Sequence, residues 1–393
     1  MSDTTFSTQH PSATSRAARP YDPVQAPPKR LFSIGNITLF VVVALLILIP
    51  LLSKSYFVFQ LNQILIYAVA VLGLNLLTGI NGQFSLGHSA FYAVGAYSCA
   101  IMVELVGVNW MLTVPIAGMI AFVFGFLFGF PALRLEGLYL ALATFALAVA
   151  TPQILKLGLI EHWTGGVQGI VMFQETFEAP PLFKVDFEPI CFDISIYAGC
   201  LKLQDGTFVY FFTLLVFCIT YLLTSALVKS RSGRAMMAIR DNRIAARSMG
   251  VSLPYYKASA FGISALITGI AGALNAIVIK FVAPDSFTFI LAILILVGMV
   301  IGGVGWLPGC LIGGISMLFL PNIAEEIDDI VIWLFGLVGQ ADALPPGNEL
   351  EQQFIRLSYF IYGVILILII YLAPSGFGGL LRSIVTRGKR LTS

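Results

Sequence analysis

Residues 56–78 read YFVFQLNQILIYAVAVLGLNLLT, a run without a charged side chain. A membrane-spanning helix needs about 20 predominantly apolar residues, so this run is long enough to cross a bilayer. Similar runs recur along the chain, and we predict ten spans. They cover residues 37–52, 56–78, 85–106, 111–130, 137–160, 207–228, 257–282, 287–304, 306–323 and 354–373. The eighth and ninth are short and interrupted by glycine, which makes them candidates for half-helices or re-entrant segments.

The composition of the whole chain indicates the same class. Of its 393 residues, 58% are hydrophobic and 11% are charged, whereas a soluble domain is about 45–50% apolar and about 25% charged. A soluble globular protein is therefore excluded, and we predict an all-α polytopic membrane protein. The net charge of +2 gives no reason to expect a nucleic-acid partner. No phosphate-binding loop and no metal-ligand spacing is present, so we expect no metal and no cofactor in this chain.

The few charges are unevenly distributed, and they determine the predicted orientation. Lys and Arg gather in the loop 229–257 and at the C-terminus, whereas the connectors 161–206 and 324–353 are acidic. Basic loops tend to remain in the cytoplasm. Ten spans with both termini in the cytoplasm place every basic segment inside and both acidic connectors outside. The predicted parts are a disordered cytoplasmic tail (1–36), a transmembrane domain (37–382) and a basic cytoplasmic tail (383–393).

The most polar interruption between two spans reads NGQFSLGHSA, from residue 81 to residue 90. Non-helical backbone at membrane depth is tolerated where protein or a cavity surrounds it, so one interpretation is a broken helix lining a translocation path. The other is a tight turn in which Ser85 caps the next helix. The candidate path residues are Asn81, Gly82, Gln83, Ser85, Gly87 and His88. A lone histidine such as His88 is expected to hydrogen-bond between helices rather than to contact a ligand.

Small residues recur at every fourth position, a spacing that lets helix backbones approach closely. The positions are Gly125 and Gly129; Ala265, Gly269 and Ala273; Gly298 and Gly302; and Gly305, Gly309 and Gly313. We expect them to pack helices within the chain, with packing against a second membrane subunit as the alternative. Glycine-rich turns at 79–82 and 302–305 resemble each other and suggest an internal repeat.

The basic loop gives the strongest indication of function. Residues 241–249 are predicted to form a short helix that ends at Gly250. Arg240, Arg243 and Arg247 fall on one face, and Ile239, Ala246 and Met249 form an apolar stripe on another. Such a helix suits docking into a groove of a soluble partner. The alternative is a helix bound to anionic lipid headgroups.

At this loop the sequence resembles the M-type permease subunit of branched-chain amino acid ABC importers. Residues 233–250 read GRAMMAIRDNRIAARSMG, and Ala245, Ala246 and Gly250 match the Ala-Ala-x-x-x-Gly core of the "EAA" loop. Ile244 replaces the usual Glu of that loop, and the usual Ile-x-Leu-Pro tail is absent. Further similar stretches are LNLLTG (74–79), GQFSLGHSAF (82–91), LRLEGLYLA (133–141), FVAPDSF (281–287) and LAPSGFGGL (372–380). The resemblance covers residues 56–382.

The resemblance implies a non-enzymatic subunit that forms half of the translocation pathway of an ATP-driven importer in the bacterial inner membrane. The implied partners are a second, homologous permease, two cytoplasmic ATPases that carry ATP and Mg²⁺, a periplasmic binding protein and membrane lipid. The residues implied in ATPase coupling are Arg240, Arg243, Ala245, Ala246, Arg247 and Gly250. Relatives also import urea and short amides, so these substrates or other amino acids are alternatives to branched-chain amino acids.

The outer connectors carry two further predictions. Cys191 and Cys200 face an oxidising compartment in this orientation, so we expect a disulfide between them, with two free thiols as the alternative. If a binding protein docks on the outside, its expected contacts are Glu325, Glu326, Asp328 and Asp329. The alternative is that these acids only keep a translocated loop hydrated.

Two other classes of protein fit the sequence less well. A secondary carrier coupled to protons or sodium would need a carboxylate at mid-membrane, and none is predicted there. A membrane enzyme, such as a lipid-modifying transferase, would need clustered His, Asp or Glu at an interface, and the sequence offers no such cluster.

Overall fold

The computed structural model describes residues 50, 55–135, 137–172, 190–194, 197–201, 207–322 and 363. All of them belong to the unit Ile47–Ser393. Apart from residues 50 and 363, the predicted spans 37–52 and 354–373 lie outside the described residues, as do both predicted tails and most of the two acidic connectors.

The described part is a bundle of apolar helices, which confirms the all-α polytopic membrane fold. Five helical stretches in it are long and apolar enough to cross a bilayer. They are α2 (Ser55–Leu74) with its π-helical continuation Asn75–Ile80, α4 (Trp110–Ala132), α5 (Leu138–Leu155), α7 (Thr207–Lys229) and α10 (Leu253–Ile279). Three shorter helices also coincide with predicted spans, namely α3 (His88–Glu104), α11 (Phe289–Gly302) and the helix Gly309–Asn322.

Short elements connect these helices. They are α6 (Glu161–Thr164), α8 (Arg231–Asp241), α9 (Arg243–Ser248), a 3₁₀ turn at Pro284–Phe287, and the strands β1 (Ile170–Val171), β2 (Ile190–Ile194), β3 (Tyr197–Leu201) and β4 (Phe281–Val282). Strand β1 pairs antiparallel with β4, and β2 pairs antiparallel with β3. These pairs connect loops and do not form a sheet layer.

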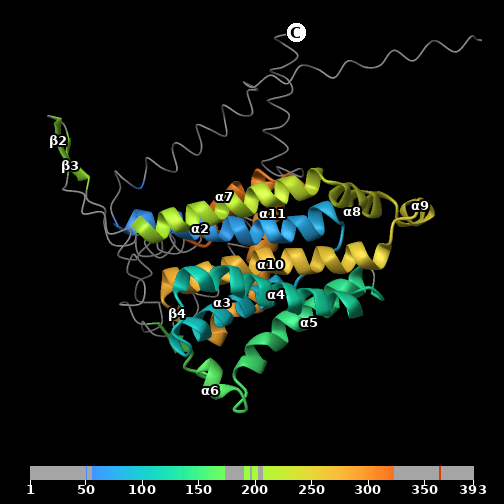
Figure 1. Ribbon diagram of the computed structural model, residues 1–393, viewed down its shortest axis with the longest axis horizontal. Coiled ribbons are helices and arrows are strands. Elements are labelled where there is room, and N and C mark those ends of the chain that lie inside the picture. The colour runs from blue at the N-terminus through green and yellow to red at the C-terminus, as the bar shows by residue number, and fades with distance from the viewer. Residues whose placement is uncertain are drawn as a thin grey trace, which may run out of the picture. The chain divides into compact units, whose positions relative to one another are not determined.

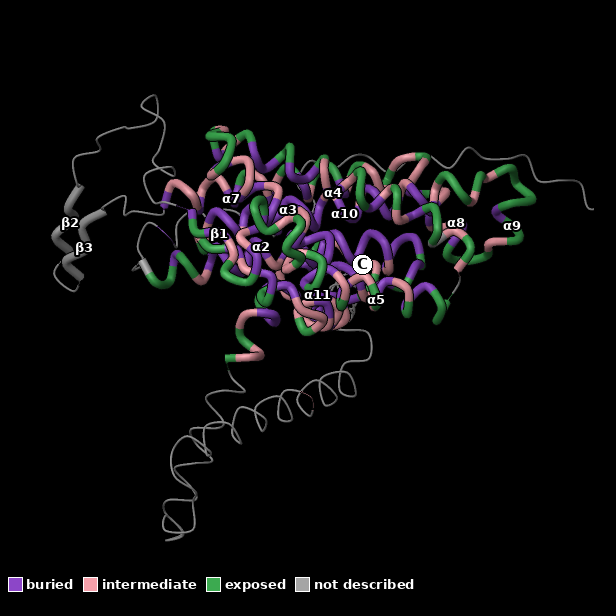
Figure 2. Tube along the Cα trace, turned by 90° about the horizontal axis from the view of Figure 1, so that it is seen from below, coloured by how far each residue is buried: buried purple, intermediate pink, exposed green. Residues whose placement is uncertain are grey.

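Helix α10 is the centre of the bundle, where it packs against α2, α3 and α4 (Figures 1 and 2). Small residues make this packing close. Gly125 of α4 lies against Ala265 of α10, and Gly269 of α10 lies against Ala121 of α4. A Cβ atom placed on Gly298 would lie 3.0 Å from the carbonyl oxygen of Gly313. The predicted packing of small residues within the chain is therefore confirmed for these helices.

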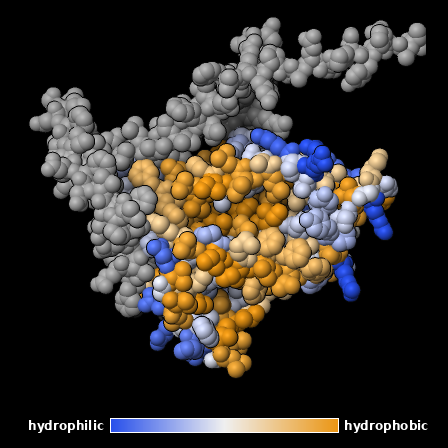
Figure 3. Space-filling view, viewed as in Figure 1, coloured by the Kyte–Doolittle hydropathy of each residue, from blue (hydrophilic) through white to orange (hydrophobic). Residues whose placement is uncertain are grey.

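The loops meet at two opposite ends of the helices. Helices α8 and α9 lie at one end, and α6 and β4 lie at the other (Figure 1). We call these the inner and the outer end. At the outer end β1 pairs with β4, and Lys156 forms an ion pair of 2.6 Å with Asp285. Within the described residues, the basic loop 229–257 and the start of the acidic connector 161–206 therefore lie at opposite ends. Figure 3 shows a hydrophobic surface between polar groups gathered at these two ends.

Helix α11 is too short to cross a bilayer alone. At about 1.5 Å per residue, its 14 residues extend about 21 Å, whereas the hydrocarbon core is about 30 Å thick. The segment nevertheless joins the two ends, because β4 pairs at the outer end and Gly305 contacts Gly79 at the inner end. Strand β4 and the 3₁₀ turn precede α11 in this segment.

Candidate functional site

The basic loop forms two helices: α9 (Arg243–Ser248) confirms the short helix predicted over 241–249, and α8 precedes it as a separate helix. Helix α8 ends at Asp241, and Asn242 has extended backbone dihedrals (φ −157°, ψ 107°). The Asn242 side chain accepts hydrogen bonds of 3.0 Å from the backbone amides of Ile244 and Ala245. Asparagine is among the strongest N-cap residues, so it starts a new helix at Arg243 instead of continuing α8.

The far end of α9 is closed as predicted. Gly250 has φ +80°, its amide donates to the carbonyl of Arg247 at 3.0 Å, and the amide of Val251 donates to that of Ala246 at 3.1 Å. These two hydrogen bonds form a Schellman motif, which needs a left-handed residue such as glycine. The N-cap and this motif together hold α9 as a short, separate helix.

Helix α9 presents an apolar and basic surface to solvent. Ile244 and Met249 are 81% and 85% exposed, and Arg247 and Ala245 are exposed beside them. The predicted apolar stripe is therefore wrong in part. Ile239 and Ala246 are buried against the rest of the chain, and only Met249 lies on the exposed side.

Arg240 does not share a face with Arg243 and Arg247, because it belongs to α8. Its Nη1 donates a 2.8 Å hydrogen bond to the carbonyl oxygen of Gly79, and its Nε and Nη2 each lie 3.0 Å from Asp241 Oδ1. Arg243 is half-buried at the start of α9. Of the three predicted docking arginines, only Arg247 is exposed on α9.

The carbonyl that Arg240 binds is released by the π-helix at the end of α2. In an α-helix the Gly79 carbonyl would accept from the amide of residue 83. Here the Gln83 amide donates to Leu77 instead, at 3.1 Å, and the Asn81 amide donates to Leu76 at 3.2 Å. The Gly79 carbonyl is therefore available to the guanidinium group.

The two glycine-rich turns lie side by side at the inner end. Asn75 Oδ1 accepts from the amide of Gly305 at 2.7 Å, and Asn75 Nδ2 donates to the carbonyl of Trp306 at 3.1 Å. A Cβ atom on Gly79 would lie 2.5 Å from the nitrogen of Gly305, so this approach requires glycine. The similarity of the two turns in sequence thus corresponds to a contact between them.

The polar segment after α2 is a buried, extended turn. Asn81, Gln83, Ser85 and Gly87 are buried, and Gly82 is exposed with φ +74°. Helix α3 begins at His88 with Gly87 in the N-cap position, so the prediction that Ser85 caps this helix is wrong. Ser85 Oγ instead accepts from the Gly87 amide at 3.3 Å within the turn.

His88 links three helices through a chain of hydrogen bonds. Its Nε2 lies 2.7 Å from Ser264 Oγ, which donates its single proton to the carbonyl of Gly73 at 2.7 Å. Ser264 must therefore accept from His88, which assigns the imidazole proton to Nε2. Nδ1 then accepts from Ser85 Oγ at 3.2 Å. The expected role of His88 as a hydrogen-bonding residue between helices is confirmed.

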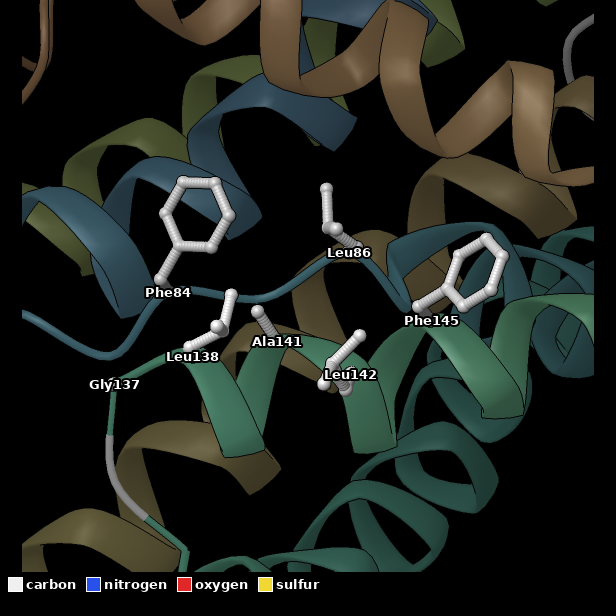
Figure 4. Close-up of a pocket in the computed structure, with 7 residues that line it drawn as sticks. All are labelled: Phe84, Leu86, Gly137, Leu138, Ala141, Leu142 and Phe145. Atoms are coloured by element: carbon white, nitrogen blue, oxygen red, sulfur yellow. The ribbon is translucent and has the colours of Figure 1, made fainter.

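An apolar hollow of about 480 Å³ lies beside this turn. Along the extended segment, side chains alternate between the interior and the hollow, and Phe84 and Leu86 border the hollow. Leu138, Ala141, Leu142 and Phe145 of α5 form its other side (Figure 4). The segment is fixed to α5 by a 2.9 Å hydrogen bond from the Leu86 amide to Thr144 Oγ1. Sequence reasoning selected the polar residues and missed Phe84 and Leu86, which their alternation with Gln83 and Ser85 would have indicated.

The outer predictions are only partly within the described residues. The register of β2 and β3 places Cys191 opposite Cys200. Glu325, Glu326, Asp328 and Asp329 lie outside the described residues. In the part of the chain that the structure describes, no group of three His, Cys, Asp or Glu residues gathers to hold a metal ion.

Comparison with known proteins identifies relatives of this chain. The family described as "branched-chain amino acid transport system / permease component" matches residues 56–370. The chain is 33% identical over 282 residues to the high-affinity branched-chain amino acid transport system permease protein LivM of Escherichia coli K12, covering 69% of this chain and 64% of that protein. The LivM protein of Salmonella typhimurium LT2 is 32% identical over the same length, with the same shares covered.

A relative with lower sequence identity is matched over a larger share of its own length than the two LivM proteins above. The probable branched-chain amino acid transport permease protein LivM of Methanocaldococcus jannaschii is 24% identical over 326 residues, covering 80% of this chain and 82% of that protein. The chain thus spans 64% of the length of its two bacterial LivM relatives. No solved structure matches the chain.

Proposed function

The chain belongs to the family of branched-chain amino acid transport permease components, and from this we propose that it is a membrane subunit of an ATP-driven importer. It would form half of the translocation pathway, beside a second, homologous permease in the bacterial inner membrane. The proposed substrates are branched-chain amino acids, because the relatives carry that name. Urea, short amides and other amino acids are the alternatives.

The observation that carries the proposal is helix α9. It is capped by Asn242, closed by Gly250 and held at the inner end with an exposed surface of Ile244, Arg247 and Met249. A short helix with exposed apolar and basic side chains suits a groove on a soluble protein. We propose that this surface binds a cytoplasmic ATPase, which supplies ATP and Mg²⁺ from outside this chain. Ala245 lies on the same exposed surface, whereas Ala246 is buried and Arg243 is half-buried at the start of α9.

The apolar hollow gives the second part of the proposal. We propose that Phe84, Leu86 and the facing residues of α5 border the path of the substrate at the inner end. A volume of about 480 Å³ falls within the range of small-molecule sites, and the absence of charged residues from its lining suits an aliphatic side chain. The buried residues on the side of the segment away from the hollow then hold it in place. They are Asn81, Gln83, Ser85 and His88.

On the outer side we propose that a periplasmic binding protein delivers the substrate. Its proposed contacts are Glu325, Glu326, Asp328 and Asp329. Complementary charge would mainly raise the rate of association.

Reconstitution tests the proposal. The chain is placed in liposomes with its partner permease, two ATPases and the binding protein, and uptake of labelled leucine is measured with and without ATP. We expect uptake only with ATP, competition by isoleucine and valine, and no competition by urea or acetamide. Uptake by the chain alone, driven by a membrane potential and indifferent to ATP, would instead identify a secondary carrier.

A matched pair of variants tests the docking surface. Arg247→Glu reverses a charge on the exposed surface of α9 and is expected to reduce ATPase co-purification. Arg234→Glu makes the same change on α8, where the Arg234 guanidinium bonds the carbonyl of Lys229 at 3.0 Å, and should leave co-purification intact. Equal co-purification in both variants would show that α9 does not bind the ATPase.

A further inference from the structure

We propose, on the basis of the function proposed above, that Arg240 and Asn75 are positioning residues that couple α8 and α9 to the glycine turns at the inner ends of α2 and α11. They differ in role from Arg247, because they bind this chain and not the ATPase. When α9 is bound to an ATPase and moves with it, both glycine turns would then be displaced together.

The first link is the contact between α8 and the end of α2. Arg240 Nη1 donates to the Gly79 carbonyl at 2.8 Å, and the Arg240 side chain lies along Gly82. A Cβ atom on Gly82 would lie 2.6 Å from Arg240 Cγ, so the arginine fits only over a glycine. A cation beside unpaired carbonyls at a helix C-terminus is also favoured by the helix dipole.

The second link joins the end of α2 to the turn after α11. Asn75 accepts from one backbone group of that turn and donates to the next, at Gly305 and Trp306. Two hydrogen bonds of opposite direction fix both the distance and the orientation of the turn. A Cβ atom built on Gly305 would lie 3.7 Å from Arg240 Nη1, so α8, the end of α2 and this turn meet at one point.

The element between the two links is a π-helix. Asn75 begins the π-helix, and Gly79 lies within it. A π-helix is rare, is frequent at functional sites and has hydrogen bonds that span five residues instead of the four of an α-helix. Asn81 Oδ1 is buried just beyond it, and no donor within the described residues reaches that oxygen. A buried acceptor without a donor destabilises the turn, and a rearrangement that supplied a donor would recover that hydrogen bond.

The test uses the complete importer in nanodiscs with three variants. Arg240→Ala removes the first link, Asn75→Leu removes the second at nearly constant volume, and Arg234→Ala removes a guanidinium from α8 that touches neither turn. ATPase co-purification, ATP hydrolysis, leucine uptake and amide hydrogen exchange of residues 79–83 and 303–306 are measured for each.

We expect the two link variants to keep their ATPases and to hydrolyse ATP, while uptake falls about tenfold or more. Arg240→Ala loses one hydrogen bond from a charged group, and Asn75→Leu loses two neutral ones. Exchange should rise about tenfold, at 79–83 in Arg240→Ala and at Gly305 in Asn75→Leu. Arg234→Ala should behave as wild type in all four measurements.

Three results overturn the inference while the proposed function stands. They are loss of the ATPases in Arg240→Ala, which would make it a docking residue; unchanged exchange in the link variants; and normal uptake despite faster exchange. Absence of ATP-dependent uptake by the wild-type importer overturns the proposed function itself, and the inference with it. That result is seen before any variant is compared, so the two failures are distinguishable.

Discussion

Replacing Ser264 with alanine should destabilise the bundle measurably, because Ser264 is the centre of the chain from His88 to Gly73. Its hydroxyl is fully buried and makes two hydrogen bonds of 2.7 Å to residues of two other helices. The variant leaves the His88 Nε2–H without an acceptor. Hydrogen bonds between membrane helices contribute on average about 0.6 kcal/mol and at most about 1.7 kcal/mol. With two such bonds lost, we expect the free energy of unfolding to fall by about 1–2 kcal/mol.

The assay is unfolding in mixed micelles, followed by circular dichroism as sodium dodecyl sulfate is added. Ser259→Ala on the same helix is the control, because Ser259 Oγ donates only within α10, to the carbonyl of Tyr256 at 3.1 Å. It should change stability by less than about 0.5 kcal/mol. A double-mutant cycle with His88→Leu should give a coupling energy of about 1 kcal/mol. Equal stability of the two serine variants, or zero coupling, would refute the stabilising role of this chain of bonds.

Three further predictions follow from the ends of the molecule. Gly250→Val should lower ATPase co-purification, because a β-branched residue is strained at φ +80°; Gly107→Val, at φ +71° in an outer turn with open space around it, is the matched control and should leave co-purification normal. Thiol labelling of denatured, unreduced protein should modify three of the five cysteines, and reduction should add Cys191 and Cys200; labelling of all five without reduction would exclude the disulfide. Neutralising the four acids of residues 325–329 should raise the apparent KM for uptake at low salt, and an unchanged salt dependence would contradict their docking role.

The spans were predictable because their signal is local. A run such as 56–78 carries its own hydropathy, and the structure places α2 with its π-helical continuation there. Helix ends were less predictable, since they depend on individual caps. Helix α3 begins three residues later than the predicted span at 85, and α10 begins four residues earlier than the predicted 257. Neither helix start is marked by a side-chain cap hydrogen bond, since Gly87 is the N-cap of α3 and Ser252 caps α10 without one.

The sequence contains a sign that the basic loop divides into two helices, although the predicted common face of the three arginines does not take it into account. Asn242 stands before a run of good helix formers, which is the pattern of an N-cap. The spacing of Arg240, Arg243 and Arg247 suggested one continuous face and outweighed that local sign. Periodicity assumes an unbroken helix, so a single capping residue changes which side chains share a surface.

The contacts at the inner end could not be predicted in the same way. Arg240 and Gly79 are 161 residues apart, and Asn75 and Gly305 are 230 residues apart. Two glycine-rich turns in one sequence are compatible with a repeat, with independent turns or with a contact, and composition does not distinguish these cases. The structure distinguishes them by the atoms that lie beside each glycine. A Cβ atom on Gly79 would collide with Gly305, and one on Gly82 would collide with Arg240. The glycines are therefore explained by what approaches them. For the same reason Arg240, which its neighbours in sequence suggest as a docking residue, is assigned by its distant partner Gly79 to a contact within the subunit.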